Sequence, residues 1–470
     1  MDELPSRQSP RPGIAARIGR FLLAWEVPLA AVVFFCGYAP VFTRTPERGD
    51  WLPCYVQAAQ RMQAGELLQR SEAAAYMYPP AMAMVTVPLS HLPPRASVAA
   101  WYVVNVLALC VLFVSAWRLA GGPALTGLSW RWRIAFWLTL ALAGRWLVSP
   151  LENKQFDIVI AAFVTAGGLW LARGRDWKGA AAIGVAVAMK CTPLLFLPYL
   201  WWRGKWRAGI MVLVTAVSIN LLPDFLWPRQ TGESYAIEWL QFTTHTLDQQ
   251  MPGGWWSDPR LNQSLAGMFR RALGWTLPEG EVPSSAVEQT VRWAIYGTAA
   301  ALLGITAWRF GRPFRAADAF SHQASVPSGG ERRRTAVEAA VIMCLMLLLS
   351  PMSGKAHYVI LLLPLMLSAR EAAWGSRGSI ILAVGLLVSG PLVSKGFVGR
   401  EWGGLLLEWG IPTWHVLIAL AGLWVMLGRA GESHRRALPH GFHHWPNAAH
   451  RLGAGAAGLP RRSRQWTGEL

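Results

Sequence analysis

The sequence predicts an all-α integral membrane protein folded as one helical bundle, and three observations support this. Of the 470 residues, 53% are hydrophobic and only 15% are charged, and the mean hydropathy is +0.29, as is typical of a chain with many membrane spans. Apolar windows of spanning length recur along most of the sequence. The 27 Trp residues include a group beside Arg203 and Lys205, as expected for rings at the headgroup layer.

Ten apolar windows predict about ten membrane crossings. The first, 21–42, is not followed by a small-residue cleavage site, so we expect a retained helix and not a signal peptide. The other windows are 97–117, 132–149, 156–172, 208–227, 289–308, 335–350, 357–369, 378–394 and 411–428.

Two further apolar segments do not fit an ordinary crossing. The segment 81–92 is short and bracketed by prolines, so we expect a short re-entrant or juxtamembrane helix that enters from the outer face. The segment 179–202 is interrupted by Lys190 and Pro193. We expect it to form a broken hairpin that returns to the side from which it came.

The distribution of charge predicts the orientation of the bundle. The net charge is +18, and with both termini in the cytoplasm the inner segments hold nearly two thirds of the 44 Lys and Arg residues. Acidic residues show the opposite bias. The basic composition therefore indicates a positive-inside topology and does not require nucleic acid as a partner. We expect a cytoplasmic tail over 1–20, a single transmembrane domain over 21–429, and a flexible, basic, His-rich cytoplasmic tail over 430–470.

This orientation places an unusual loop, 43–80, on the outer face. In it, Asp50 precedes a run in which Tyr55 lies on the apolar face of a predicted helix. A carboxylate just outside a membrane is suited to act as a general base, and a helix cap is the alternative role. Tyr78, followed by two prolines, predicts extended backbone before a short helix.

Two polar groups occur at the ends of, or inside, apolar segments. The run 152–157 (ENKQFD) contains Lys154 and Gln155, and it predicts either a substrate-facing cluster or a structural hydrogen-bond cluster. Lys190 lies within an apolar run. We expect its ammonium to pair with a carboxylate, to help hold a phosphate, or to satisfy backbone carbonyls at the tip of the hairpin.

Two later outer segments complete the candidate set. The long outer loop 228–286 contains Asn262 and Gln263, and Lys355 and His357 stand two residues apart at an outer helix end. A cation and an imidazole there predict contact with a phosphate, with packing and hydrogen bonding as the alternative. The five cysteines form no CxxC pair and no spacing resembles a metal site, so we expect neither a metal nor another cofactor.

Together these segments resemble glycosyltransferase family 87, the polyprenol-phosphate-mannose-dependent mannosyltransferases and their relatives of the GT-C class. The resemblance implies a GT-C-like bundle, a polyprenyl-phosphate-linked sugar donor, and a lipid or glycan acceptor. It is carried by Asp50 with Tyr55, Tyr78-Pro79-Pro80, the Gln155 segment, 181–208 around Lys190, Asn262-Gln263-Ser264-Leu265 with Arg271, and Ser350-Pro351 through His357-Tyr358.

The resemblance also implies roles for individual residues. In the family an aspartate of the first outer loop is the presumed catalytic base, and a histidine near the later Ser-Pro motif is at the active site. Asp50 and His357 match these positions. Where the family often reads Gly-Gln-x-Asn, this chain has Lys154-Gln155-Phe156-Asp157.

The predicted function is transfer of a hexose, mannose by resemblance, with inversion, at the outer face of a bacterial cytoplasmic membrane. Asp50 would be the base and His357 would act with it. The expected substrate contacts are Tyr55, Tyr78, Lys154, Gln155, Lys190, Asn262, Gln263 and Lys355, of which Lys355, His357 and then Lys154 would face the phosphate.

A multipass transporter or flippase and a non-catalytic envelope scaffold are the alternative functions. Transporters place polar groups near the bilayer centre and often contain internal repeats. In this sequence the polar groups gather at one face and no repeat is found, which favours an enzyme.

Overall fold

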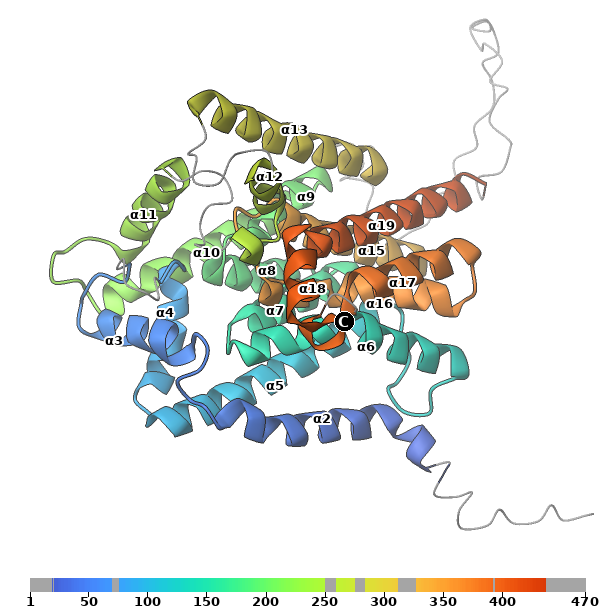
Figure 1. The fold of residues 1–470 in the computed structure, drawn as a ribbon, viewed down its shortest axis with the longest axis horizontal. Coiled ribbons are helices and arrows are strands. Elements are labelled where there is room, and N and C mark those ends of the chain that lie inside the picture. Colours follow the sequence, from blue (N-terminus) through green and yellow to red (C-terminus); the bar gives the residue numbers. More distant parts are fainter. Residues whose placement is uncertain are drawn as a thin grey trace, which may run out of the picture. The chain divides into compact units, whose positions relative to one another are not determined.

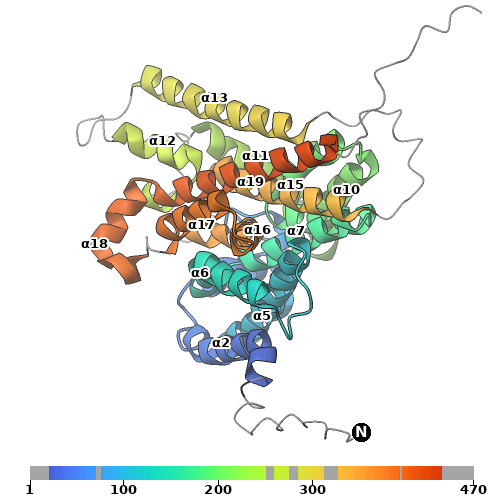
Figure 2. The ribbon, with the colours of Figure 1, turned by 90° about the vertical axis from the view of Figure 1, so that its right-hand side faces the viewer.

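The computed structural model of the chain consists of helices packed into a bundle (Figures 1 and 2). It describes residues 19, 21–69, 76–249, 259–274, 284–311, 327–391 and 394–436. No strand occurs in these ranges, so the all-α prediction is confirmed for them. The chain divides into two units, 1–430 and 431–470, and the candidate site lies in the first.

Some predictions fall outside the described residues. They concern 1–18 and nearly all of the C-terminal tail, 437–470. Parts of the two long outer loops, 70–75, 250–258 and 275–283, are also outside.

In the first half of the chain the elements are α2 (Glu26–Thr43), the π-helical η1 (Trp51–Val56), α3 (Gln57–Gln63), α4 (Pro80–Ser90), α5 (Pro94–Leu119), α6 (Trp130–Glu152), α7 (Asp157–Ala172), α8 (Asp176–Met189), the 3-10 helix η2 (Thr192–Leu195), α9 (Phe196–Trp202) and α10 (Trp206–Leu226). In the second half they are α11 (Tyr235–Gln249), η3 (Pro259–Leu261), α12 (Leu265–Gly274), α13 (Ser285–Phe310), α15 (Gly329–Leu348), the 3-10 helix η4 (Lys355–Leu361), α16 (Leu362–Ala373), α17 (Arg377–Ser389), α18 (Lys395–Glu408) and α19 (Ile411–Arg436).

Each of the ten apolar windows overlaps one or more helices in its described residues, because each window supplies enough apolar surface for a helix packed in the bundle or facing lipid. Within the described residues, six helical stretches are long and apolar enough to cross a bilayer, and three more, including α4 and α7, are apolar but shorter. The fold is therefore that of an integral membrane protein. The number of ten crossings and the cytoplasmic location of the termini remain predictions.

The segment 179–202 forms the broken hairpin expected from the sequence. Lys190 is extended (φ −158°, ψ 128°) and ends α8, and η2 and α9 then lead back. Lys205 Nζ, after the hairpin, lies 2.5 Å from Oδ1 of Asp176, before it. The chain thus returns to the end at which it started and leaves Lys190 at the tip.

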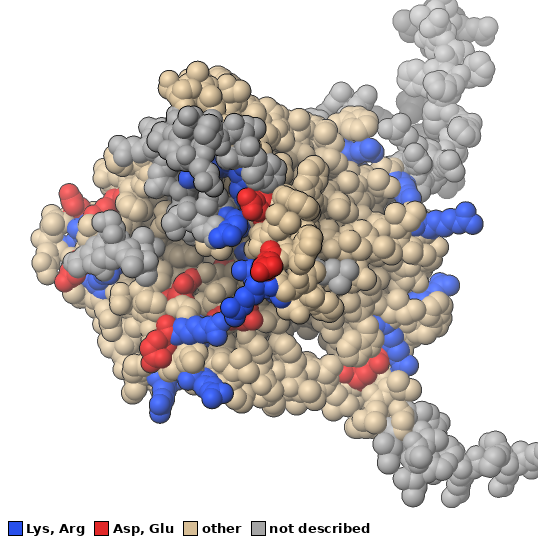
Figure 3. All heavy atoms as spheres, in the orientation of Figure 1, with Lys and Arg blue, Asp and Glu red and all other residues tan. Residues whose placement is uncertain are grey.

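Residues at or near the ends of several predicted spans contact one another on the side where the base of this hairpin lies. These contacts are Arg133–Glu26, Trp132–Trp374, Arg333–Glu371 and Arg203–Glu338. In Figure 3 the right-hand edge, where α2 begins in Figure 1, displays Lys and Arg with fewer Asp and Glu. A positive-inside topology predicts such a bias on the cytoplasmic side, and the orientation itself stays a prediction.

At the other end, the short helix α4 packs against η1 and α3 of the loop 43–80. Pro79 is extended (φ −58°, ψ 157°) and α4 begins at Pro80, as the Tyr-Pro-Pro run predicted. Asn220 of α10 accepts a hydrogen bond from the N–H of Ala81 at 3.1 Å. Tyr76 Oη donates to the carbonyl oxygen of Pro79 at 2.7 Å. These bonds fix the loop that follows Asp50 against the bundle.

Candidate active site

The turn between α6 and α7, residues 153–156, organises the candidate site. Lys154 has a φ of +51°, a left-handed conformation that costs a non-glycine residue about 1 kcal/mol. Its Nζ donates to the carbonyl oxygens of Thr45, at 2.7 Å, and of Arg48, which offsets this cost. The turn is thereby tied to the loop that carries Asp50.

Asp50 is fixed to the same turn through its backbone and its side chain. Gly49 has a φ of +88°, and a Cβ there would lie 2.7 Å from the carbonyl oxygen of Asn153, so this close approach requires glycine. The N–H of Asp50 donates to that oxygen at 2.9 Å. Gln155 Nε2 donates to Asp50 Oδ2 at 2.5 Å. The Asp50 side chain makes no capping bond to η1, so the alternative role as a helix cap is not realised.

The surroundings of Asp50 make it a stronger base than an exposed carboxylate. Burial raises the pKa of Asp50, the negative charge of Asp157 raises it further, and the hydrogen bond from Gln155 acts in the opposite direction. Gln155 Oε1 is buried and has no hydrogen-bond partner among the residues that the structure describes. A buried acceptor without a described partner thus lies next to Asp50.

Aromatic rings pack around the candidate base. Trp51, which follows Asp50, stacks on Trp101 with 4.3 Å between ring centroids. The ring centroids of Tyr55 and Tyr78 are 5.4 Å apart, and the charge of Asp50 acts on both hydroxyls. The two tyrosines that the sequence singled out therefore meet beside Asp50, and their contact with substrate stays a prediction.

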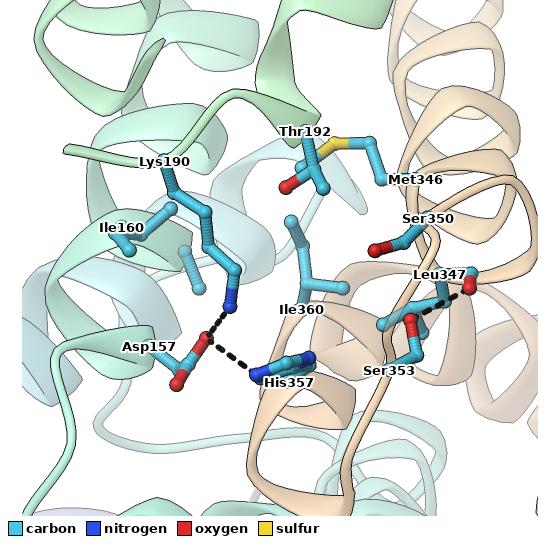
Figure 4. Close-up of a pocket in the computed structure, with 11 residues that line it drawn as sticks. Asp157, Ile160, Lys190, Thr192, Met346, Leu347, Ser350, Ser353, His357 and Ile360 are labelled. Carbon is cyan, nitrogen blue, oxygen red and sulfur yellow. Dashed lines mark hydrogen bonds and ion pairs between the residues drawn. The ribbon is translucent and has the colours of Figure 1, made fainter. Parts of the chain in front are cut away.

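A second carboxylate, Asp157, joins two residues that are far apart in the sequence. Its Oδ1 accepts a hydrogen bond from Lys190 Nζ at 2.8 Å and lies 3.9 Å from His357 Nε2. The Nδ1 of His357 accepts from the N–H of Gly354 at 3.1 Å, which anchors the ring to the loop before it while Nε2 lies on the side of Asp157. Figure 4 shows Lys190, after the end of α8, and His357, in η4, converging on Asp157.

These three side chains line a partly open cavity of about 20 Å³. Thr192 and Ser350 also line it (Figure 4). A space of this size holds about one water molecule. It does not admit a phosphate group, so a lipid phosphate attracted to Lys190 or His357 would bind at its mouth.

Asn262 and Gln263 hold the loop that leads to His357. Asn262 Nδ2 donates to the carbonyl oxygen of Pro351 at 2.9 Å, and its Oδ1 accepts from the N–H of Ser353 at 3.0 Å. The N–H of Gln263 donates to the carbonyl oxygen of Ser353 at 2.7 Å. Both side chains are fully buried. This geometry favours a positioning role over the direct substrate contact that the sequence suggested.

The lysines of the predicted set have different environments. Lys154 is buried and its ammonium is used by backbone carbonyls, and burial lowers its pKa. This disfavours Lys154 as a phosphate contact. Lys190 is paired with Asp157, whereas Lys355, at the start of η4, is half-buried and makes no side-chain hydrogen bond or ion pair with a described residue.

Sequence reasoning did not single out Asp157 as a site residue, although its position offered a signal. An acidic residue at the start of the apolar helix α7 and a lysine inside another apolar run are both costly without a partner. A pair between the two residues removes both costs, and Asp157 is the only acidic residue at the start of α7. The pairing of Asp157 with Lys190 could therefore have been predicted from the sequence.

A family model matches more than half of the chain. The model of glycosyltransferase family 87 matches residues 76–351. This stretch contains Tyr78, the turn 153–156 and Lys190, while Asp50 precedes it and His357 follows it.

Two characterised relatives extend the comparison. The chain is 27% identical over 343 residues, 70% of this chain and 68% of that protein, to a polyprenol-phosphate-mannose-dependent alpha-(1-2)-phosphatidylinositol pentamannoside mannosyltransferase of Mycobacterium tuberculosis. It is 26% identical over 408 residues, 80% of this chain and 82% of that protein, to a polyprenol-phosphate-mannose-dependent alpha-(1-2)-phosphatidylinositol mannoside mannosyltransferase of Mycolicibacterium smegmatis. No solved structure matches the chain. On the family match, which spans more than half of its length, the chain belongs to glycosyltransferase family 87.

Proposed function

We propose that this membrane glycosyltransferase moves mannose from a polyprenyl-phosphate-mannose donor to a lipid or glycan acceptor with inversion, and that Asp50 is the catalytic base. The observation that carries the proposal is the placement of Asp50. Its carboxylate is partly buried and accepts a hydrogen bond from Gln155, and its pKa is raised. These are the properties of a general base matched to a hydroxyl nucleophile.

The proposed step is a single displacement. An acceptor hydroxyl donates its proton to Asp50 while its oxygen forms a bond to the anomeric carbon of mannose. The bond between that carbon and the phosphate oxygen breaks, and its electron pair leaves with the polyprenyl phosphate. Gln155 Oε1, the unused acceptor beside Asp50, would orient the hydroxyls of the sugar or of the acceptor.

Charge develops on the departing phosphate, and hydrogen-bond donors near its path lower the barrier. Lys190 Nζ and His357 Nε2 supply donors at the cavity. Asp157 neutralises Lys190, so this group carries little net positive charge of its own. In the proposal Asp157 is a positioning residue that keeps the two donors in place.

The proposed identities of the donor and of the sugar are based on the relatives. Both of the relatives described above are named as polyprenol-phosphate-mannose-dependent enzymes that act on phosphatidylinositol mannosides. For this chain we propose the same donor class, and an acceptor that is a lipid or glycan at the outer face of a bacterial cytoplasmic membrane.

The donor assignment is tested with membranes that contain the full-length chain and radiolabelled polyprenyl-phosphate-mannose. We expect a new labelled glycoconjugate whose anomeric configuration is opposite to that of the donor. Polyprenyl-phosphate-glucose serves as the matched donor control. Retention of configuration would contradict the displacement mechanism, and labelling from the glucose donor alone would contradict the sugar assignment.

The outer location is tested by cysteine labelling in intact cells, in a variant without native cysteines. We expect a membrane-impermeant maleimide to label cysteine at the exposed positions 153 and 395, near the site. Cysteine at 131 and 377, exposed at the opposite end, should react only after the cells are opened. The reverse pattern would place the site in the cytoplasm.

A further inference from the structure

An apolar cavity of about 560 Å³ lies between α2, α5 and α6, outside the candidate site. These are three of the six helical stretches that are long and apolar enough to cross a bilayer. Figures 1 and 2 show α2 along the edge of the bundle, beside α5 and α6. Only Val27 and Phe42 of α2 are buried, so most of the surface of this helix faces the bilayer or the cavity.

Polar contacts fix α2 to the bundle at both ends of the cavity. At one end, Arg133 Nε of α6 lies 2.9 Å from Glu26 Oε1. At the other end, Tyr102 Oη of α5 donates a hydrogen bond to the carbonyl oxygen of Phe35 at 2.6 Å. These contacts hold α2 in place along the cavity, so the cavity is part of the fold and not a gap beside a loose helix.

The lining of the cavity is suited to hydrocarbon and not to water. Among the described residues that line it, none is charged, and Cys110 and Trp137 carry the only polar side-chain atoms. A water molecule in a cavity needs several polar partners, and the cost of an empty apolar cavity grows with its volume. Phe34, Val114 and Trp137 line the cavity and are also exposed on the spanning helices. The cavity is therefore continuous with the surface that faces lipid, and a lipid chain can enter it from the bilayer.

The dimensions of the cavity match one acyl chain. An apolar cavity of about 150 Å³ holds one benzene ring, so a volume of about 560 Å³ has room for roughly 20 carbon atoms. The lining residues Phe136 and Val148 are about 18 Å apart along α6, and one leaflet of the hydrocarbon core is about 15 Å thick. A polyprenyl chain, built of many five-carbon units, would extend well beyond this space.

The cavity reaches the end of the bundle that is opposite the candidate site. Trp101 of α5 donates to the carbonyl oxygen of Lys154 in the site at 3.0 Å. Leu109 and Val114 of the lining are about 12 and 20 Å farther along this helix. Arg118 follows Val114 by one turn on the same face of α5 and is exposed. A cation at this position suits the phosphate of a lipid in the leaflet opposite the site.

We propose that the cavity between α2, α5 and α6 binds one acyl chain of a glycerophospholipid, whose phosphate lies at Arg118. The chain completes the packing of α2 on the bundle. This helix leads to Thr45 and Arg48, whose carbonyl oxygens accept hydrogen bonds from Lys154 of the site. The bound lipid thereby supports the loop that holds the candidate base, without contacting the substrate.

The test measures lipid binding by native mass spectrometry of the full-length, delipidated chain in detergent, with dioleoyl phosphatidylglycerol as the probe. Gly144→Phe and Gly37→Phe are the matched variants. Gly144 lines the cavity and Gly37 of α2 does not, and a Cβ at either position meets no atom of a described residue within 4 Å. We expect Gly144→Phe to weaken binding about tenfold, because its ring takes the place of part of the chain. Gly37→Phe should change binding less than about twofold, and Arg118→Gln should weaken it about fivefold.

The Tm distinguishes a filled cavity from a damaged fold. Phosphatidylglycerol should raise the Tm of wild type and of Gly37→Phe, and should not raise that of Gly144→Phe. Without lipid, Gly144→Phe should melt at or above the temperature of wild type, because its ring fills part of the cavity. If Gly144→Phe does not fold, Gly144→Leu provides the same comparison with a smaller side chain.

Three results would contradict the proposal. Equal affinity of wild type and Gly144→Phe for phosphatidylglycerol would overturn the site, and so would equal weakening in both glycine variants. Unchanged affinity in Arg118→Gln would overturn the position of the phosphate. Binding of polyprenyl monophosphate in place of phosphatidylglycerol, lost in Gly144→Phe, would assign the cavity to the donor. No sugar is transferred in this assay, so its outcome is independent of the labelled-mannose experiment.

Discussion

The hairpin carries a buried charge cluster at each end, and the two clusters are built differently. At the base, Glu338 accepts from Tyr199 (3.2 Å), Arg203 (3.0 Å) and Arg334 (2.9 Å). At the tip, Asp157 binds Lys190 and faces His357 across 3.9 Å. The base cluster is saturated with hydrogen bonds, whereas the tip cluster lines a cavity and lies beside the unused Gln155 Oε1.

The difference separates a structural cluster from a functional one. A buried carboxylate with three donors has nothing left to offer a ligand, so the Glu338 cluster joins α9, α15 and the end of α13. Incomplete pairing is costly and persists where a ligand completes it. Both clusters would appear alike in a count of buried ion pairs, and it is the unused atoms and the cavity that distinguish them.

The largest expected effect is on stability, at the base of the hairpin. Glu338→Ala removes a buried carboxylate that accepts hydrogen bonds from three side chains, so we expect unfolding to become easier by about 3–5 kcal/mol, measured as a lower Tm in detergent. Glu371→Ala, which removes a partner of the half-exposed Arg333, is the matched control and should change stability by less than about 1 kcal/mol. The rate of transfer per folded molecule should be retained in both variants. A Tm of Glu338→Ala equal to that of wild type would show that the Glu338 cluster does not stabilise the fold.

A smaller effect, on rate, is expected at the tip. Asp157→Ala frees Lys190 and His357 from their shared anchor, so we expect the transfer rate per folded molecule to fall about ten- to a hundredfold. Asp157 accepts a hydrogen bond from one side chain and faces His357, whereas Glu338 accepts from three side chains, so the Tm should fall less than in Glu338→Ala. The comparison breaks if Asp157→Ala lowers the Tm as much as Glu338→Ala while its rate is unchanged.

The smallest effect is a shift in the pH profile. A base acts as the carboxylate, so kcat should fall as the pH drops through the raised pKa of Asp50. Gln155 opposes that raise, so Gln155→Leu should increase the pKa further and move the acidic limb to higher pH. Gln63→Leu, which removes an amide bound to Ser90 instead, should leave the limb in place. If the acidic limb does not move in Gln155→Leu, the limb does not report the titration of Asp50.

Periodicity and breakers were enough to predict much of the fold. Each apolar window became a helix, Lys190 with Pro193 broke the hairpin, and Pro79 set the start of α4. These features are local, because they depend on residues within a few turns of one another. The number of crossings is different, since α7 and α17 are shorter than a full span and tertiary packing decides how deep they lie.

The candidate site could be predicted only in part, for the same reason. Asp50 and Gln155 were both identified from the sequence, but their hydrogen bond depends on how the loop folds onto the turn after α6. Lys154 was read as a substrate contact, and its partners, the carbonyls of Thr45 and Arg48, are set by that same folding. Roles that depend on distant backbone atoms leave no pattern in the sequence.

The most direct test of the account is the transfer rate of Asp50→Asn, measured with polyprenyl-phosphate-mannose on equal amounts of folded protein. The amide keeps the shape of the side chain and cannot accept the proton of the acceptor hydroxyl. We expect the rate to fall at least about a hundredfold while the Tm stays near that of wild type. A rate equal to that of wild type would show that another group is the base.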